Sequence, residues 1–220
     1  MPEKLRMRFS KTGRAIWLSH LDLMRTMQRA FLRAGYPLKY SEGFNPHAQI
    51  SILLPLSVGC ASECELMDFQ LTEDADLAAL PARLSAVLPE GIVVHEAYEA
   101  GTKAKYLKWL RVTGRYEYDA RDGAAMAARL AEFYARPAIV ITRKTKRGEG
   151  EMDLVPAIRA LRAEAGERRV TVDAVISAQE PTLNPDHLVA ALRQRAPDLA
   201  PDFAAFTRRE VYLENGEVFR

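Results

Sequence analysis

The sequence predicts an α+β protein made of two tandem ferredoxin-like (βαββαβ) sandwiches, the second of them irregular. Its 220 residues are 48% hydrophobic, which is enough for two small cores. Segments that alternate between apolar and polar residues predict strands, and they flank segments of helical period. The order β-α-β-β-α-β fits residues 4–97 and returns less regularly after residue 107. We therefore expect one domain at 1–102 and a second at 103–220.

Each element of the first domain has its own signal. Residues 4–11 alternate, which predicts a half-buried strand with a basic outer face. Ser19 is a good cap for a helix that runs from His20 to Ala34, and Gly35 is a typical residue to end it. The remaining expected elements are strands at 49–56, 64–71 and 92–97 and a helix at 75–88.

The second domain repeats this order with an extra helix. We expect residues 138–143 and 150–154 to pair across a Lys- and Gly-containing loop, and residues 156–165 to form the extra helix. Pro185 suits the first turn of a helix that reaches Arg195. The other expected elements are strands at 107–118, 168–177 and 206–213 and a helix at 123–135.

Positive charge is unevenly distributed, although the formal net charge is only +2. Residues 1–35 contain eight Lys and Arg residues against Glu3 and Asp22, which makes this segment about +6. A second basic cluster consists of Arg143, Lys144, Lys146 and Arg147. Such clusters suit a polyanion such as RNA. The alternative is a solvated surface whose charges balance in three dimensions.

The segment SEGFNPH, residues 41–47, is unusually rich for a connector. Gly43 permits backbone conformations that other residues avoid, and Pro46 restricts both itself and the residue before it. One interpretation is a rigid turn that buries Phe44 in the core, while the side chains of Asn45 and His47 form hydrogen bonds with backbone groups. The other is a presented surface, where Phe44 stacks on a base while Asn45 and His47 contact a base edge or a phosphate.

Two basic segments are candidates for contact with an RNA backbone. Arg25, Arg29 and Arg33 share one helix face, which could contact phosphates. The alternative is a solvated face on which Asp22 pairs with Arg25 or Arg29. Loop 143–150 carries Lys144, Lys146 and Arg147 and is either a phosphate contact or an exposed hairpin tip. Cys60 and Cys64 lack further ligands nearby, so we expect two reduced thiols and no metal.

His20 and His47 are the candidates for acid–base catalysis, because imidazole titrates near neutral pH. They flank a predicted helix of about 15 residues, or about 22 Å, so their pairing is not implied. The catalytic residues therefore remain unknown. No apolar run is long enough to span a bilayer and no secretion signal begins the chain, so we expect a cytoplasmic protein without membrane contact.

Residues 5–71 resemble the radical-SAM-linked protein family, a bacterial domain of unknown function that lies beside, or is fused to, cobalamin-binding-type radical SAM proteins. The resemblance is carried by SHLD at 19–22, Arg25 with Arg29, SEGFNPH at 41–47 and LSVGCASECE at 56–65. Looser similarity covers KTKRGEGEMDL at 144–154 and NPDHL at 184–188. Ala48 departs from the family pattern, which usually has Pro-His-Pro or similar after the Asn.

The resemblance implies a radical SAM partner that holds the iron–sulfur cluster and S-adenosylmethionine, with no cofactor in this chain. Together with the basic segments, it leads us to expect a non-catalytic accessory domain that binds tRNA or rRNA for modification. One alternative is a module that docks on the radical SAM protein without RNA. Another is a metal-independent endoribonuclease that uses His20 or His47.

Overall fold

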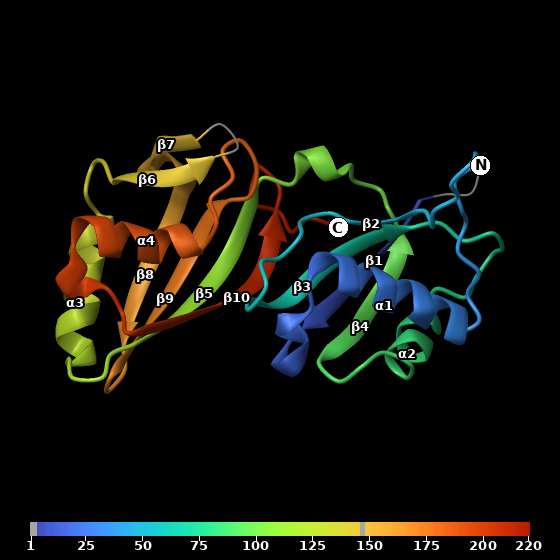
Figure 1. Cartoon of the computed structure of the whole chain (residues 1–220), viewed down its shortest axis with the longest axis horizontal. Coiled ribbons are helices and arrows are strands. Elements are labelled where there is room, and N and C mark those ends of the chain that lie inside the picture. The colour runs from blue at the N-terminus through green and yellow to red at the C-terminus, as the bar shows by residue number, and fades with distance from the viewer. Residues whose placement is uncertain (1–3, 146–147) are drawn as a thin grey trace. The chain divides into compact units, whose positions relative to one another are not determined.

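The structure is a computed structural model that describes residues 4–145 and 148–220 (Figure 1). It is an α+β protein of antiparallel strands and helices that divides into two compact units. The first unit extends to Tyr106 and includes Arg220, and the second is Leu107–Phe219. No helix in the described part of the chain is long and apolar enough to cross a membrane.

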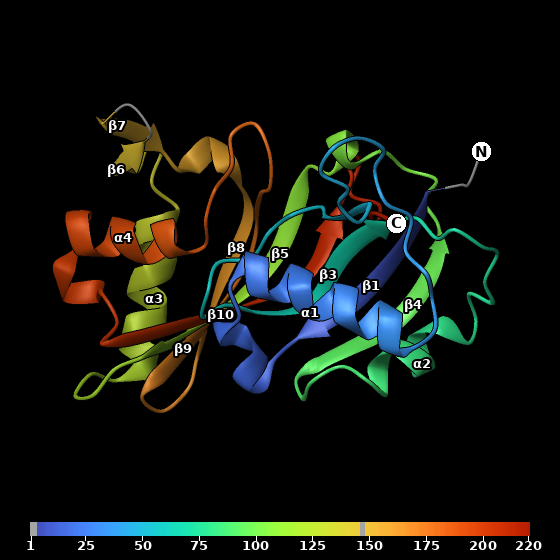
Figure 2. The same cartoon turned by 45° about the vertical axis from the view of Figure 1, so that its right-hand side comes forward.

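The first unit follows the predicted order of strands and helices. Its sheet has the order β4-β1-β3-β2, with every neighbouring pair antiparallel. Both helices lie on the same face of this sheet (Figures 1 and 2). The elements are β1 (Leu5–Lys11), α1 (His20–Arg33), β2 (Ile50–Ile52), β3 (Ala61–Phe69), α2 (Leu80–Ser85) and β4 (Ile92–Glu99), with 3-10 turns at Gly13–Trp17 and Ala104–Tyr106.

The core of the first unit lies between α1 and the sheet. Met27 and Phe31 belong to the buried stripe of α1 and pack in one cluster with Phe9 of β1. The rings of Phe31 and Phe69 are 5.0 Å apart between centroids. Burying each such side chain stabilises the fold by about 1.5–3 kcal/mol. Packing of this stripe therefore fixes the ends of α1 relative to the strands.

The caps of α1 confirm the two terminal signals in the sequence. The hydroxyl of Ser19 accepts a hydrogen bond from the Asp22 N–H at 3.2 Å, which satisfies one of the donors exposed in the first turn. Gly35 follows the helix with φ of +76°, a conformation that favours glycine. The chain leaves α1 at a defined point and enters the SEGFNPH segment.

The second unit has an antiparallel sheet of order β10-β5-β9-β8, with α3 and α4 on one side (Figures 1 and 2). Strands β6 and β7 pair with each other, as the sequence predicts, and form a separate two-stranded sheet in the described part of the chain. The elements are β5 (Trp109–Glu117), α3 (Gly123–Tyr134), β6 (Val140–Thr145), β7 (Gly148–Asp153), β8 (Ile158–Ala165), β9 (Arg169–Ser177), α4 (Asp186–Arg195) and β10 (Phe203–Tyr212), with 3-10 turns at Val155–Ala157 and Pro197–Leu199.

The predicted helix at 156–165 is wrong, because these residues form the edge strand β8. Leu161 pairs with Ala174 of β9 and is half-buried, whereas the adjacent Arg162 and Glu164 are exposed. The segment is rich in Ala, Arg and Glu, which favour helices, but pairing with β9 overrides this weak local preference. Helix α2 is likewise shorter than the predicted 75–88, and β2 is shorter than 49–56.

Candidate nucleic-acid interface

Residues 39–49 form a small hairpin that projects after α1 (light-blue trace in Figures 1 and 2). Its neck is closed by backbone pairing. Tyr40 and Ala48 form an antiparallel bridge, and the Ser41 N–H donates to the His47 carbonyl at 2.9 Å. These bonds hold the two ends of the SEGFNPH segment together, so its tip has fixed anchors.

The side chains of Ser41 and His47 lock this neck a second time. The Ser41 hydroxyl accepts a hydrogen bond from the His47 N–H at 3.1 Å and lies 2.9 Å from Nδ1 of the same residue. The carbonyl of Asn45 is 3.5 Å from that Nδ1. The orientation of the imidazole is thus set by contacts within its own loop. Sequence reasoning had given Ser41 no role.

Phe44 is fully exposed at the tip of the hairpin. The interpretation in which Phe44 docks into the core is therefore wrong. Gly43 beside it has φ of +119°, which allows the sharp reversal that turns the aromatic ring outward. Asn45 is also exposed. The hairpin presents an aromatic ring and polar side chains to solvent, which are the groups that bind unstacked bases.

The basic face of α1 exists as predicted, with Arg25, Arg29 and Arg33 all exposed. Arg25 makes a long ion pair of 3.8 Å with Asp22, and Arg33 donates to the Val87 carbonyl at 2.9 Å. Arg29 makes no ion pair or hydrogen bond with other described residues. Exposed pairs contribute little to stability, so these guanidinium groups can turn to a phosphate at small expense.

The second basic segment lies on the β6–β7 hairpin. Lys144 is exposed opposite Glu149, and Arg143 is half-buried opposite Gly150. Lys146 and Arg147, the other two predicted contacts, lie outside the residues that the structure describes. The same hairpin is tied to α4 by paired hydrogen bonds of 2.9 Å between the Gln194 side chain and the backbone of Thr142.

His20 and His47 are not brought together as an acid–base pair. His20 is the first residue of α1, and His47 follows the far end of this 14-residue helix, which is about 21 Å long. Within the described part of the chain, no hydrogen bond joins the two rings or connects either ring to a carboxylate. Catalysis by this pair has no geometric support.

Sequence reasoning missed three exposed apolar side chains in the same unit. Trp17 precedes α1, and Leu21 and Leu32 lie on it. The run AIWL at 15–18 was a signal for Trp17, since four successive apolar residues cannot all face one core. Large contiguous patches of such side chains are a feature of protein-binding surfaces.

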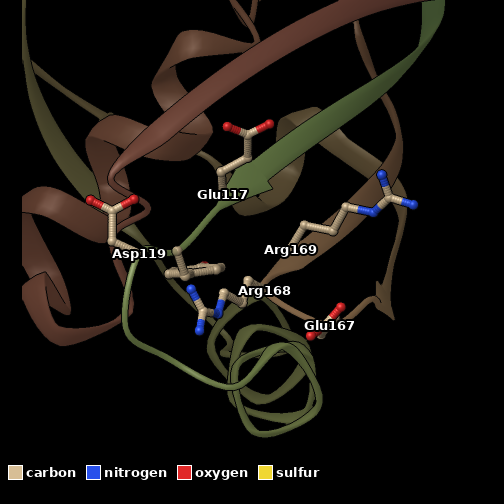
Figure 3. A pocket seen from close by; sticks show the side chains of 6 residues that line it. Glu117, Asp119, Glu167, Arg168 and Arg169 are labelled. Atoms are coloured by element: carbon tan, nitrogen blue, oxygen red, sulfur yellow. The ribbon is translucent and has the colours of Figure 1, made fainter.

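A pocket of about 470 Å³ opens on the second unit and is lined by Glu117, Tyr118, Asp119, Glu167, Arg168 and Arg169 (Figure 3). The charged ends of the five labelled side chains point in different directions and do not converge on one point. No group of three or more His, Cys, Asp or Glu side chains suited to a metal ion occurs among residues 4–145 and 148–220. This pocket offers no recognisable catalytic arrangement.

Comparison with known proteins gives a family but no activity. A crystal structure of an unknown protein from Galdieria sulphuraria is similar over 94% of this chain and 99% of that chain, at 9% identity and a TM-score of 0.28. No curated protein matches the sequence. Residues 4–185 match a family described as an uncharacterized protein conserved in bacteria (DUF2344). The chain belongs to this family.

Proposed function

We propose that the protein is a non-catalytic accessory protein that binds structured RNA, either tRNA or rRNA, and works with a radical SAM enzyme that modifies it. The exposed ring of Phe44, held at the tip of a closed hairpin, carries this proposal. An isolated aromatic ring in water gains by stacking on a base, at about 1–3 kcal/mol per base. Recognition at this loop requires no catalytic group.

The polar neighbours of Phe44 supply the remaining contacts. His47 is oriented by Ser41, and Asn45 is exposed beside the ring. Arg25, Arg29 and Arg33 of α1 would contact phosphates, because guanidinium groups match phosphate oxygens in pairs. Such contacts give affinity with little sequence preference, whereas the loop would read an unpaired base.

Both units place their candidate RNA-binding loop at the same point of the chain. In the first unit the 39–49 hairpin connects α1 to β2, and in the second the β6–β7 hairpin connects α3 to β8. Both sheets also put the last strand of the unit beside the first, as β4 beside β1 and β10 beside β5. With the separate β6–β7 pair set aside, both also put the third strand between the first and second, as β3 between β1 and β2 and β9 between β5 and β8. This order supports the further proposal that the units are two ferredoxin-like sandwiches.

The partner rests on the resemblance of residues 5–71 alone. In this proposal the iron–sulfur cluster and S-adenosylmethionine belong to the partner, and this chain contributes binding and orientation of the RNA. The electrons and methyl or other groups of the reaction would come from that partner's chemistry. The chain's own side chains would determine which nucleotide is presented.

A second candidate function is docking on the partner protein without RNA. The exposed Trp17, Leu21 and Leu32 favour it, because aromatic and large apolar side chains are enriched in protein interfaces. In this case Phe44 would insert into a pocket of the partner. The two functions predict different losses: variants of the binding surface would abolish the RNA complex in the first case and the complex with the partner protein in the second.

The deciding experiment begins with ultraviolet crosslinking of the full chain in cells, followed by sequencing of the RNA recovered with it. We expect enrichment of one tRNA or rRNA region. Binding of that RNA should be lost in Arg25→Glu/Arg29→Glu and weakened about tenfold or more in Phe44→Ala. An Arg193→Glu variant, which alters an exposed arginine of α4, is the charge control.

RNA at background level, together with a radical SAM protein that is lost from the same pulldown in Phe44→Ala, would replace the RNA proposal by the docking proposal. Unchanged RNA affinity in Arg25→Glu/Arg29→Glu would show that α1 is not the phosphate contact. Circular dichroism of each variant excludes misfolding as the cause.

A further inference from the structure

The second unit contains a pocket of about 450 Å³ whose lining includes three arginines. One wall is a face of α3 extended by a residue just after the helix, at positions i, i+3, i+4 and i+7. The opposite wall is the end of α4 and the 3-10 turn after it. The lining residues are Arg129, Glu132, Phe133 and Arg136 on the first wall and Arg195, Ala196, Pro197, Asp198 and Leu199 on the second.

Two of the three guanidinium groups are held in place but have unused donors. Nε of Arg195 donates to the Val140 carbonyl at 2.6 Å, and its two terminal nitrogens make no hydrogen bond with other described residues. The guanidinium carbon of Arg136 lies 4.8 Å from the centroid of the Phe133 ring. Stacking of this kind fixes the plane of the group while its N–H edges stay available.

The carboxylates of the pocket do not neutralise these two arginines. Asp198 pairs with Arg129, whose hydrogen bond lowers the pKa of that carboxyl below its usual value. Glu132 is four residues before Arg136, a favourable spacing, yet makes no ion pair with it among the described residues. Three guanidinium groups against two carboxylates leave the lining at +1.

The helix ends explain the positive charge only in part. Arg136 follows α3 and Arg195 ends α4, where the partial negative charge of a helix C-terminus favours cations by about 0.3–1 kcal/mol. That attraction does not occupy the N–H donors of either group. Two forked donor groups in one concavity match an anion with several oxygens on one centre.

We propose that this pocket binds the phosphate monoester or pyrophosphate group of a nucleotide or of an RNA 5′ end, through Arg136 and Arg195, with Arg129 as the third donor. A phosphate has enough oxygens to accept from two guanidinium groups at once, and its negative charge exceeds that of a carboxylate. The inference concerns the second unit and does not depend on the RNA-binding role of Phe44 and α1.

The test is calorimetric titration of the full chain with sodium pyrophosphate at constant ionic strength, with sodium chloride as the blank. We expect Arg136→Gln and Arg195→Gln each to weaken binding by about tenfold or more, as for loss of a charged hydrogen-bond donor. Arg193→Gln, on the same helix but outside the pocket, should stay within about twofold. Asp198→Asn should bind more tightly, since it releases Arg129.

No heat of binding from the unaltered chain, or an equal loss in Arg193→Gln, would overturn the proposal. Asp198→Asn separates binding from folding, because a purely structural pocket would lose stability in this variant without gaining affinity. Arg25→Glu/Arg29→Glu should leave pyrophosphate binding unchanged, so failure of the RNA proposal is distinguishable from failure of this one.

A competition series assigns the source of the phosphate. Displacement of pyrophosphate by AMP but not by a short 5′-phosphorylated RNA supports a nucleotide. Displacement by the phosphorylated RNA, and not by the same RNA with a 5′ hydroxyl, supports an RNA end. Equal displacement by phosphorylated and unphosphorylated RNA would contradict recognition of a phosphate monoester.

Discussion

Each unit contains an Arg–Asp ion pair between two neighbouring strands, but the first pair is buried and the second is partly exposed to solvent. In the first, Arg6 of β1 and Asp68 of β3 are joined at 2.7 Å with side chains only 1% and 2% exposed. In the second, Arg111 of β5 and Asp173 of β9 are joined at 2.8 Å, but are 49% and 29% exposed. Pairing of β1 with β3, and of β5 with β9, brings such charges together in each unit, whereas the solvent around them sets their energetic value.

For the two hairpins the order of burial is reversed: the hairpin of the first unit has an exposed tip and that of the second unit contributes buried side chains. The tip of the 39–49 hairpin has no core side chain, and its aromatic residue Phe44 is fully exposed. The β6–β7 hairpin is docked, with Ile141 and the adjoining Leu154 fully buried. A hairpin held at its neck leaves its tip exposed to solvent, while a docked hairpin also contributes to the core.

Removing the carboxylate of the buried pair should have the largest effect. We expect Asp68→Ala to lower the free energy of unfolding by about 3–5 kcal/mol, because it deprives a buried arginine of its counter-charge. Asp173→Ala should lower it by about 1 kcal/mol or less, since the second pair is partly solvated. Urea unfolding at pH 7 measures both values, and equal values would break the comparison.

The next largest effect should be a difference in stability between substitutions in the two hairpins. Ile141→Ala removes a fully buried side chain and should destabilise the protein by about 2–5 kcal/mol. Phe44→Ala removes a larger side chain but should change the free energy of unfolding by about 0.5 kcal/mol or less. Thermal unfolding of the two variants side by side is the measurement. A large loss in Phe44→Ala would mean that the ring is packed in solution.

A smaller effect is expected where Ser41 locks the hairpin neck. Ser41→Ala removes the hydroxyl that binds the backbone N–H and ring of His47. We expect local opening to become easier by about 1 kcal/mol, or about fivefold in hydrogen exchange of loop amides. Exchange in β6 and β7 is the internal control, and unchanged protection at His47 would contradict the proposed lock.

The smallest effect should be a dependence of stability on pH. Burial, followed by nearby arginines, lowers the pKa of His95 in the first unit and of His187 in the second. Above the ordinary pKa of 6.5 both rings are neutral in the folded and the unfolded chain, so stability does not depend on their protonation there. As the pH falls below 6.5, the unfolded chain takes up protons more readily, and the folded state loses stability.

The control for this dependence is His187→Gln, since glutamine cannot titrate. Its free energy of unfolding should fall less than that of the unaltered chain between pH 7.5 and pH 5.5. A fall of the same size in both proteins would show that His187 titrates alike in the folded and unfolded states.

The elements that sequence reasoning predicted best are those with strong local periodicity. The capped helix α1, the alternating strands β1 and β9, and the β6–β7 pairing follow from patterns that repeat over several residues. The basic outer face predicted for β1 is wrong at Arg6 and Lys11, because both side chains are buried. The error at β8 has a physical reason. The helix propensity of a short Ala- and Arg-rich segment is too weak to outweigh its pairing with β9.

The candidate site was predictable in its residue types and not in its geometry. Glycine, proline and an aromatic residue between a helix and a strand identified the SEGFNPH segment as more than a connector. Whether Phe44 faced the core or solvent depended on how the loop closed, through Ser41 and the Tyr40–Ala48 bridge. The arginine pocket was less visible, because its two walls are 59 residues apart in sequence, from Arg136 to Arg195.

The sequence by itself determined the α+β class, the capped basic helix and the location of the two loops proposed to bind RNA, because these depend on residues close together along the chain. Only the tertiary structure decided which side chains are solvated. It buried the Arg6–Asp68 pair, exposed Phe44, converted residues 158–165 to a strand and gathered Arg129, Arg136 and Arg195. Exposure depends on what packs over a residue, and those neighbours come from distant parts of the chain.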